Sequence, residues 1–397
     1  MTTNTQVPPQ APPEAQPDPF ATAERRALRE SVRSFMRREA LEHLSGWESA
    51  GEIPRSLHLR AAEAGLLGVG FAEDIGGSGG TVVDTAVITE EIIGSGGSSG
   101  LCAALFTHGI ALPPLVAEGD PAKIDAVVRP VLAGRAIAAL AVTEPDGGSD
   151  VASLRTRASR DGDSYVLAGR KTFITSGARA DWVTVAARTG GPGASGISLL
   201  LVPTSAPGFA VERRLAKMGW HCSDTAELAF DDCRVPAANL LGAEGSGMAQ
   251  LASQFAGERL ALAVHGYAVA QRCLDLTLDW VRSRTTFGRP LISRQVVRHK
   301  VVEMHRVTDV ARVYTRSALL LRAAGQDAVA EAALAKNTAV AAAEYVVNEA
   351  VQLHGGAGYM ADSEVERHYR DARILGIGGG ATEILTELAA RRLGFVP

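Results

Sequence analysis

The chain has 397 residues, of which 46% are hydrophobic and 21% charged, so it is a globular protein with room for two or three domains. Its net charge of −4 gives no electrostatic case for binding nucleic acid or an acidic membrane surface, and without any run of about 18 apolar residues we expect no membrane span. Its four cysteines show no CxxC spacing, which argues against a metal site or disulfide framework and predicts a reducing, cytoplasmic location.

Residues 1–19 are predicted to form a disordered tail, because the first 18 residues contain five prolines together with Thr, Asn and Gln. This stretch has no apolar core and no arginine, so it resembles neither a secretory signal nor a transit peptide. Residues 20–137 are predicted to form an N-terminal helical domain, because Val32, Phe35 and Met36, and later residues 85–93, show helical spacing. Glycine-rich breaks separate these helices. We interpret the breaks as turns, since neither GxxxxGK[ST] nor a strand-linked GxGxxG occurs.

Residues 138–243 are predicted to form a compact antiparallel β-barrel domain. Short apolar or alternating runs bounded by Gly, Pro and Asp are typical of strands, and no helix-length segment interrupts them. These runs begin at Tyr165, Trp182, Ile197 and Ala226.

Residues 244–397 are predicted to form a C-terminal four-helix bundle. Residues 248–284 contain no proline and could form one helix about 50 Å long. The alanine-rich stretch 328–343 would allow two helices to approach closely. The further predicted helices span about 295–324, 327–353 and 382–392. The fold class is therefore α+β multidomain, with a helical domain, a β-barrel domain and a helical bundle in this order.

Two short segments of the predicted β-domain have the residues needed to bind a ligand that has a planar ring with a polar edge. In residues 139–150, an apolar run is followed by Pro145, two glycines and a Ser-Asp pair, which leaves backbone N–H groups and small hydroxyls open to a ligand. In residues 171–177, Phe173 and Thr175 point to the same face of a strand, so that one could cover the ring while the other bonds its edge. Each segment alone is equally consistent with a β-turn that has a polar edge.

Together, in this order and spacing, the two segments resemble the flavin-binding segments of the acyl-CoA dehydrogenases. The resemblance runs from about residue 20 to the end, and the order of helical, β and bundle domains is that of the family. Further matching motifs are residues 65–70, 217–225, 284–288, 352–359 and 369–373. The resemblance implies FAD-dependent α,β-desaturation of an acyl-CoA thioester, with electrons passed to an electron-transfer flavoprotein, in a homotetramer or at least a dimer.

The resemblance also implies which residues hold FAD. Val142, Thr143 and Ser149 should contact the flavin ring or the pyrophosphate. Phe173, a tryptophan in most relatives, should lie over the ring, with Thr175 near N5. The ADP half of FAD should be held across a subunit boundary by Arg284, Phe287, Gln295, Gln352, Gly355 and Gly356. The remaining expected cofactor-binding residues are Thr382 and Glu383, next to Ala381, which replaces the threonine that usually contacts the flavin.

The catalytic base is the most informative position. Glu258 falls on an apolar stripe with Leu251, Phe255 and Leu262, and no cation lies three or four residues away, so its pKa should be raised unless a distant partner binds it. Most relatives carry the base in a C-terminal loop, where this chain has Gly379, which cannot accept a proton. Glu258, immediately before an arginine, matches the position used by a smaller branch that resembles isovaleryl-CoA and long-chain acyl-CoA dehydrogenases.

The substrate-binding residues implied by the resemblance are Ser149, Arg259, Gly379 and Gly380. The Gly379 N–H, together with a ribityl hydroxyl of the flavin, should polarise the thioester carbonyl, and Arg259 should orient the substrate or the CoA tail. No motif encodes the acyl chain length. The space at residues 378–380 and the placement of Glu258 favour a branched short-chain acyl-CoA.

Other functions are compatible with the same fold. A flavin monooxygenase needs no carboxylate base, so Glu258 on its apolar stripe argues against that function. An acyl-CoA oxidase differs mainly in oxygen access, which the sequence does not show. A catalytically silent scaffold is disfavoured, because the flavin-contact residues and the base are both present.

Overall fold

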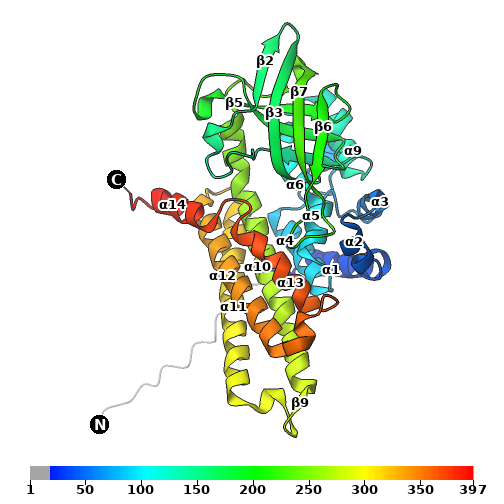
Figure 1. Ribbon diagram of the computed structural model, residues 1–397, viewed down its shortest axis with the longest axis vertical. Coiled ribbons are helices and arrows are strands. Elements are labelled where there is room, and N and C mark those ends of the chain that lie inside the picture. The colour runs from blue at the N-terminus through cyan, green and yellow to red at the C-terminus, as the bar shows by residue number, and fades with distance from the viewer. Residues whose placement is uncertain (1–17, 397) are drawn as a thin grey trace, which may run out of the picture.

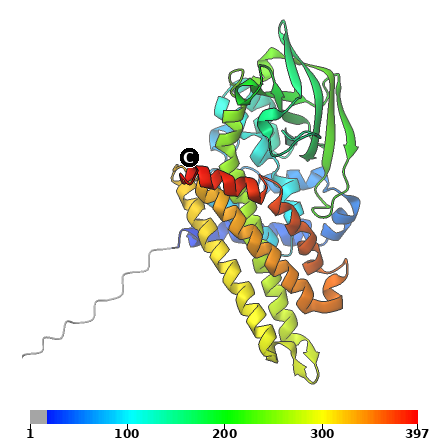
Figure 2. The same ribbon diagram turned by 60° about the vertical axis from the view of Figure 1, so that its left-hand side comes forward.

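The computed structural model describes residues 18–396, which form helices, then a twisted sheet, then helices again (Figure 1). The predicted order of the three parts is confirmed. Two residues of the predicted tail already belong to the fold, since Asp18 caps the short helical turn that begins at Pro19. Residues 1–17 of that tail lie outside the described residues. The sheet lies at one end of the molecule, and the long helices extend to the other end (Figures 1 and 2).

The N-terminal part includes α4 (Val82–Gly94), which packs against α1, α10 and α11 and contains the predicted helical stretch 85–93. α4 begins at a capping box, in which the Thr81 hydroxyl accepts from the Val83 N–H and the Asp84 carboxylate accepts from the Thr81 N–H. The other helices of this part are α1 (Ala23–Phe35), α2 (Leu44–Ala50), α3 (Arg55–Glu63), α5 (Ser99–Phe106), α6 (His108–Ala111), α7 (Pro113–Glu118), α8 (Pro121–Lys123) and α9 (Arg129–Leu132).

The middle part is an open sheet, with the strand order β6-β7-β3-β2-β4-β5-β8 and with β1 paired to β4. The prediction of a β-barrel is wrong, because β6 and β8, at the two ends of this order, do not pair with each other in the described structure. β8 has only two residues and β6 is exposed along most of its length, so neither offers a long partner for closure. The predicted antiparallel pairing is confirmed for most of the sheet. The exceptions are β1 with β4 and a single residue pair of β2 with β4, which are parallel.

The strands are β1 (Ala138–Ala141), β2 (Arg157–Asp161), β3 (Ser164–Thr175), β4 (Trp182–Arg188), β5 (Ile197–Pro203), β6 (Phe209–Arg214), β7 (Thr225–Pro236) and β8 (Leu240–Leu241). The four runs predicted from the sequence lie within β3, β4, β5 and β7. Their inward residues, such as Tyr165, Leu228 and Phe230, are fully buried and give the sheet a core of its own.

The C-terminal part is built on α10 (Gly247–Ser283), α11 (Gln295–Ala323) and α12 (Val329–His354), which closely match the predicted long helices. α10 has 37 residues and is therefore about 55 Å long. Close approach of α12 to α10 depends on small residues, as predicted, because a Cβ at Gly266 would lie 2.9 Å from the Ala339 carbonyl oxygen. Figure 2 shows α11 and α12 lying along α10.

Two shorter helices follow the bundle helices. α14 (Thr382–Arg392) has the predicted bounds, whereas α13 (Glu364–Ala372) was not predicted as a helix. A small hairpin, β9 (Thr285–Thr286) with β10 (Arg289–Pro290), joins α10 to α11. Within residues 18–396, every helix is too short or too polar to cross a membrane. The remaining helical turns are Pro19–Ala21, Met36–Ala40, Glu73–Ile75, Ile124–Val128, Val151–Ser153, Ala194–Gly196, Ala237–Asn239, Leu291–Ser293, Gly355–Tyr359 and Arg373–Gly376.

α10 links the sheet to the bundle. In its first turn, Gly247 lies against β5, where a Cβ would be 2.7 Å from the Ser198 carbonyl carbon. Leu251 is buried in an apolar cluster shared with the sheet, whereas Leu260 belongs to the core of the bundle. Glu258 therefore lies where the helix passes from one core to the other.

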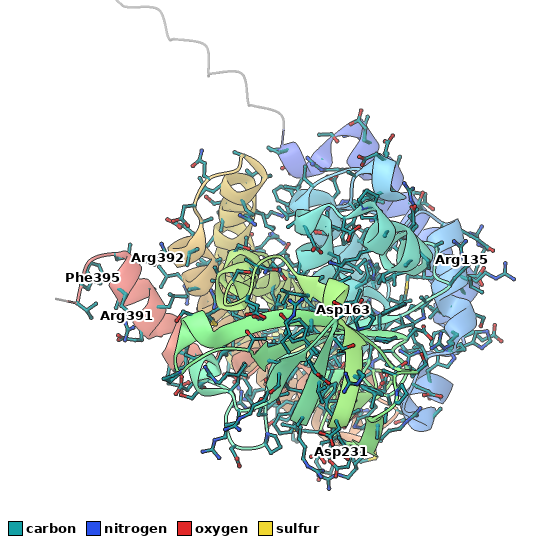
Figure 3. The ribbon with its side chains drawn as sticks, turned by 90° about the horizontal axis from the view of Figure 1, so that it is seen from above. Arg135, Asp163, Asp231, Arg391, Arg392 and Phe395 are labelled. Atoms are coloured by element: carbon teal, nitrogen blue, oxygen red, sulfur yellow. The ribbon has the colours of Figure 1, made fainter. Side chains whose placement is uncertain are left out.

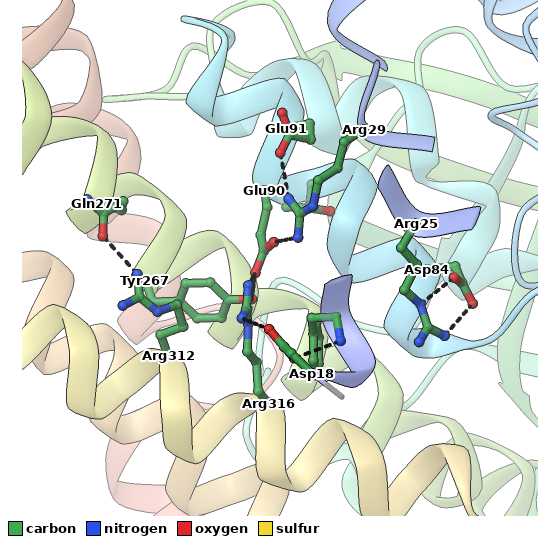
Figure 4. A network of polar contacts seen from close by, with 12 residues as sticks. Asp18, Arg25, Arg29, Asp84, Glu90, Glu91, Tyr267, Gln271, Arg312 and Arg316 are labelled. Atoms are coloured by element: carbon green, nitrogen blue, oxygen red, sulfur yellow. Dashed lines mark hydrogen bonds and ion pairs between the residues drawn. The ribbon is translucent and has the colours of Figure 1, made fainter. Parts of the chain in front are cut away.

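A buried polar network joins the N-terminal helices to the bundle (Figure 4). At its centre, the Glu90 carboxylate accepts from Tyr267 Oη at 2.6 Å, Arg316 Nη2 at 2.8 Å and Arg29 Nη2 at 2.6 Å. Desolvation raises the pKa of Glu90, but these partners outweigh it and hold the pKa below its ordinary value. Because every partner comes from a different helix, the network fixes α1 and α4 against α10 and α11.

A second buried carboxyl, that of Asp371 on α13, lies where all three parts meet. Its Oδ1 accepts the Trp220 N–H from the loop between β6 and β7 at 2.6 Å, while Oδ2 has no partner among the described residues. Burial, together with the nearby Glu48 carboxylate of α2, raises the pKa of Asp371 to about 7. The protonated carboxyl is thus the form that suits this junction.

We predict that Asp371→Asn removes part of the pH dependence of stability. An aspartate has an ordinary pKa of about 3.9, so the wild-type stability is complete below about pH 4 and falls as the pH rises through about 7. The neutral amide avoids this loss, which is on the order of 3 kcal/mol. Urea unfolding at pH 5 and pH 8, at equal protein concentration, should show the variant gaining more on the wild type at pH 8 than at pH 5.

Asp231→Asn is the matched control, because Asp231 is exposed on β7 (Figure 3). Its stability should stay within about 0.5 kcal/mol of the wild type at both values of pH. An Asp371→Asn variant that loses stability with pH just as the wild type does would contradict this account of the junction.

Candidate active site

The two alternative positions of the catalytic base meet in space. Glu258 comes from α10 and Gly379 from the loop before α14, yet a Cβ built on Gly379 would lie only 3.6 Å from Glu258 Oε1. The same Cβ would lie 2.5 Å from Leu262 Cδ1, one turn further along α10. A carboxylate on the helix and a side chain on the loop would therefore compete for one volume, and this chain places the carboxylate on the helix.

The environment of Glu258 penalises its charged form. The side chain is half-buried, and no hydrogen bond to its carboxylate is formed within residues 18–396. Desolvation raises its pKa above the ordinary value, while the positive charges of Arg259 and Lys336 partly oppose that rise. The prediction left open a distant partner for Glu258, and Lys336 is a cation that acts on it from another helix. A carboxyl with a raised pKa in such a setting is suited to act as a general base.

The loop of residues 378–380 is held by cations on both neighbouring helices. Gly379 and Gly380 have φ angles of +64° and +101°, which side chains rarely tolerate. Lys336 Nζ donates to the Gly378 carbonyl at 2.6 Å and to the Gly380 carbonyl at 2.5 Å, and Arg259 Nε donates to the Gly379 carbonyl at 3.4 Å. The Gly379 N–H has no acceptor among the described residues, so it is available to a ligand.

Sequence reasoning did not assign Lys336 to the site. This side chain is fully buried on α12, and desolvation lowers its pKa to about 8, against the opposing effect of Glu258. The signal was a lysine within the alanine-rich stretch 328–343, because a lysine that packs among small apolar residues must find acceptors in the protein interior.

The two predicted flavin segments lie side by side. The Thr172 N–H donates to the Thr143 carbonyl at 2.9 Å, and Lys171 Nζ donates both to the Val142 carbonyl and to Glu144 Oε1 at 2.8 Å. Glu144 also accepts the backbone N–H of Thr156 at 2.8 Å. Lys171 is fully buried, and desolvation lowers its pKa to about 8. This buried ion pair, which the sequence did not assign, is the support that holds both segments in place.

Phe173 presents its ring to solvent beside these segments. Its side chain is 68% exposed, its φ is +60°, and the pairing of β3 with β7 shifts between Lys171 and Ile174. Ile174 is buried and Thr175 half-buried, so Phe173 and Thr175 lie on the more accessible side, in line with the predicted shared face. The left-handed backbone at Phe173 is a bulge that strand alternation alone does not predict.

The residues predicted to bind the ADP half of FAD lie at the far end of the bundle. Trp280 links the ends of α10 and α12, since its Nε1 donates to the Leu353 carbonyl at 3.1 Å and its ring stacks on His354 at 5.0 Å. Arg284 lies over the Trp280 ring at 5.8 Å, and the Phe287 side chain at the tip of the hairpin is 94% exposed. The other predicted members of this group, also exposed, are Gln295, Gln352, Gly355 and Gly356.

This group does not meet the flavin segments within one chain. The hairpin of β9 lies at the opposite end of the molecule from β3 (Figure 1). Thr382 and Glu383 begin α14 directly after the loop of residues 378–380, and the Thr382 carbonyl accepts from Asn337 Nδ2 at 3.0 Å. Ser149 is exposed in the loop after β1. The predicted cofactor residues thus fall into three places on one chain.

The chain matches three family models in order: the acyl-CoA dehydrogenase N-terminal domain over residues 22–135, the middle domain over 139–233 and the C-terminal domain over 245–394. The crystal structure of a probable acyl-CoA dehydrogenase from Mycobacterium abscessus is similar with a TM-score of 0.93 and 61% identity, covering 94% of this chain and 100% of that chain. The long-chain specific acyl-CoA dehydrogenase of Mus musculus is 38% identical over 375 residues, covering 94% of this chain and 87% of that protein.

A glutaryl-CoA dehydrogenase from Mycobacterium smegmatis, solved in complex with FADH2, has a TM-score of 0.89 and 26% identity, covering 96% of this chain and 97% of that chain. The chain belongs to the acyl-CoA dehydrogenase family, whose members are FAD-dependent oxidoreductases. The residues present fit this cofactor. The Phe173 ring is exposed, and a Cβ at Gly147 would meet no atom within 4 Å, so a planar ring and a phosphate can approach.

We predict that Lys171→Met destabilises the protein and weakens its hold on FAD. The change leaves the Glu144 carboxylate buried without its cation, which typically costs about 3 kcal/mol. Urea unfolding should show the lower stability, and gel filtration should show the loss of bound flavin. The double variant Lys171→Met/Glu144→Gln should recover part of the stability, since no buried charge remains. Equal unfolding midpoints for Lys171→Met and wild type would rule out a supporting role for this pair.

Proposed function

We propose that Glu258 removes the α-proton of an acyl-CoA thioester in this member of the family. The observation that carries the proposal is the adjacency of Glu258 to Gly379, where most relatives carry their base. Its half-buried position and raised pKa support the same role, because a base works best when its pKa approaches the working pH. A flavin monooxygenase would not need such a carboxylate, so the presence of Glu258 argues against that alternative.

The surrounding residues have defined tasks in this mechanism. The Gly379 N–H, which lacks an acceptor in the described structure, donates to the thioester carbonyl as negative charge develops on its oxygen. Arg259 holds the Gly379 carbonyl and orients the substrate. When bound, FAD supplies the acceptor for the hydride that leaves the β-carbon. The electrons then pass to an electron-transfer flavoprotein.

FAD is held by Val142, Thr143, Ser149, Phe173 and Thr175 of one subunit, next to Thr382 and Glu383, and by the group around Arg284 of another subunit. The separation of these groups within one chain supports a cofactor shared across a subunit boundary. We therefore propose a homotetramer, or at least a dimer. α14 projects from the body with Phe395 and the basic pair Arg391 and Arg392 at its end (Figure 3), and Val296, Val302, Val310 and Val313 of α11 are exposed, as subunit contacts require.

The substrate that we favour is a branched short-chain acyl-CoA. The placement of Glu258 on α10 supports this choice, because it resembles the branch of the family that includes isovaleryl-CoA dehydrogenases. We place the reaction in the cytoplasm, because the four cysteines are buried free thiols, which suit a reducing compartment.

Glu258→Gln should keep FAD and bind acyl-CoA but lose at least about 10³-fold in rate, because the amide preserves shape and cannot accept a proton. The measurement is bleaching of the bound flavin by acyl-CoA without oxygen, over branched short, straight medium and long chains. The wild type should bleach fastest with the branched short chain. A parallel oxygen-consumption assay separates dehydrogenase from oxidase activity.

Glu63→Gln, which changes an exposed carboxylate of α3, is the control and should bleach like the wild type. Adding Gly379→Glu to Glu258→Gln should restore part of the rate, since a Cβ at residue 379 lies next to the Glu258 carboxylate. The restoration should be partial, because the backbone is left-handed there and Leu262 has to shift. Bleaching of Glu258→Gln at nearly the wild-type rate would show that the base lies elsewhere.

Arg284→Ala should weaken FAD binding at least about tenfold, because its guanidinium would pair with the cofactor pyrophosphate. Arg282→Ala, two residues earlier and equally exposed, should not change the affinity. FAD titration of the apoprotein measures the affinity of each variant, and light scattering measures the oligomeric state. A monomer that still holds FAD tightly would refute the shared site.

A further inference from the structure

We propose that Lys336 is a positioning residue for the reaction, which sets the direction of the Gly379 N–H and stabilises the charged form of Glu258. The inference rests on the proposed function, because Lys336 has this role only if Glu258 is the base and the Gly379 N–H is the donor to the thioester carbonyl. Neither role follows from any sequence motif, since Lys336 lies on a different helix from Glu258 and 43 residues before Gly379.

The direction of the Gly379 N–H follows from the geometry of the peptide unit. The Gly378 carbonyl and the Gly379 N–H belong to one planar trans peptide, so they point in opposite directions. Lys336 Nζ binds that carbonyl at 2.6 Å, and it therefore turns the N–H away from α12. The second bond of Lys336, to the Gly380 carbonyl at 2.5 Å, prevents the loop from rotating about Gly379.

Such a clamp is needed because glycines have little conformational preference of their own. Three successive glycines could adopt many backbone conformations, and holding one of them carries an entropic cost. The ammonium of Lys336 carries three N–H donors, so it can bind the two carbonyls that flank Gly379 at the same time. Arg259 completes the clamp through the Gly379 carbonyl.

The charge of Lys336 is the second part of the proposal. The charged groups that act on Glu258 are Arg259, on its own helix, and Lys336, on α12. Two charged groups act in turn on Lys336: Glu258 raises its pKa, and Arg259 lowers it. Arg373 and Glu344, which border Gly376, pair with each other at 2.8 Å. Arg259 and Lys336 are thus the two cations that offset the desolvation of Glu258, and Lys336 is the fully buried one.

Three substitutions separate the two roles. Lys336→Met removes the donors and the charge, Lys336→Gln keeps a donor without charge, and Lys336→Arg keeps both. Lys123→Met is the matched control, because Lys123 is also a buried lysine, bound to Glu118 and the Leu240 carbonyl, at a distance from the site.

The charge is tested by the pH profile of kcat/KM. Removing a positive charge raises the pKa of Glu258, so the acid limb of Lys336→Met and Lys336→Gln should move to higher pH by about one unit. Lys336→Arg and Lys123→Met should keep the limb of the wild type. In Lys336→Met, kcat should fall about 10²-fold with a much smaller change in KM, as for loss of an oriented donor.

The N–H direction is tested without turnover. In the Glu258→Gln background, the infrared stretching frequency of a ¹³C-labelled thioester carbonyl of bound acyl-CoA reports the hydrogen bond from Gly379. Adding Lys336→Met should move this frequency toward its value in free acyl-CoA, and adding Lys336→Gln should move it part of the way. Adding Lys123→Met should not move it.

The proposal is overturned if folded, FAD-containing Lys336→Met keeps both the wild-type acid limb and the wild-type carbonyl frequency. If Lys336→Met does not fold, Lys336→Gln decides by the same two measurements. Failure of the proposed function is distinct: it would appear as rapid bleaching in Glu258→Gln, with Lys336 unchanged. An acid limb that depends on Glu258 but not on Lys336 would overturn the charge role of Lys336 and leave the proposed function of Glu258 intact.

Discussion

The approach of the loop of residues 378–380 to α10 is the constraint on which the site depends. A backbone with positive φ at Gly379 passes so close to Glu258 and Leu262 that no side chain fits there without displacing a neighbour. In this chain the loop therefore presents a backbone N–H at residue 379, and the carboxylate beside it, that of Glu258, comes from the helix. α10 can do so because it passes without interruption from the core of the sheet to the core of the bundle.

Two buried lysines, one in the sheet domain and one in the bundle, each hold a segment of irregular backbone by binding its carbonyls. Lys171 holds the backbone of the first flavin segment through the Val142 carbonyl, and Lys336 holds the glycine loop through two carbonyls. Each ammonium is desolvated, and each lies near a carboxylate that restores part of the lost solvation. Irregular backbone next to a ligand has few hydrogen-bond partners of its own. A buried ammonium with several N–H donors therefore provides the rigidity that a helix or sheet would provide elsewhere.

The distribution of the cofactor residues reflects the long bundle. About 55 Å of α10 separates the sheet from the hairpin at Arg284, so no single FAD of one chain reaches both. In the proposed oligomer, a second subunit lying alongside would bring one chain's hairpin to the sheet of the other chain. The exposed valines of α11 and the projecting α14 are the surfaces that such an assembly would cover.

The sequence alone predicts the order of domains, the long helices, the strands and Glu258, because apolar periodicity, glycine breaks and local motifs express short-range physics. It predicts a barrel wrongly, because closure depends on whether β6 and β8 meet, which no local pattern records. It also misses Lys336, Lys171 with Glu144, and the left-handed backbone at Phe173. Their roles arise from packing between elements distant in the chain, where desolvation and the direction of individual carbonyls decide, and only the tertiary structure brings those groups together.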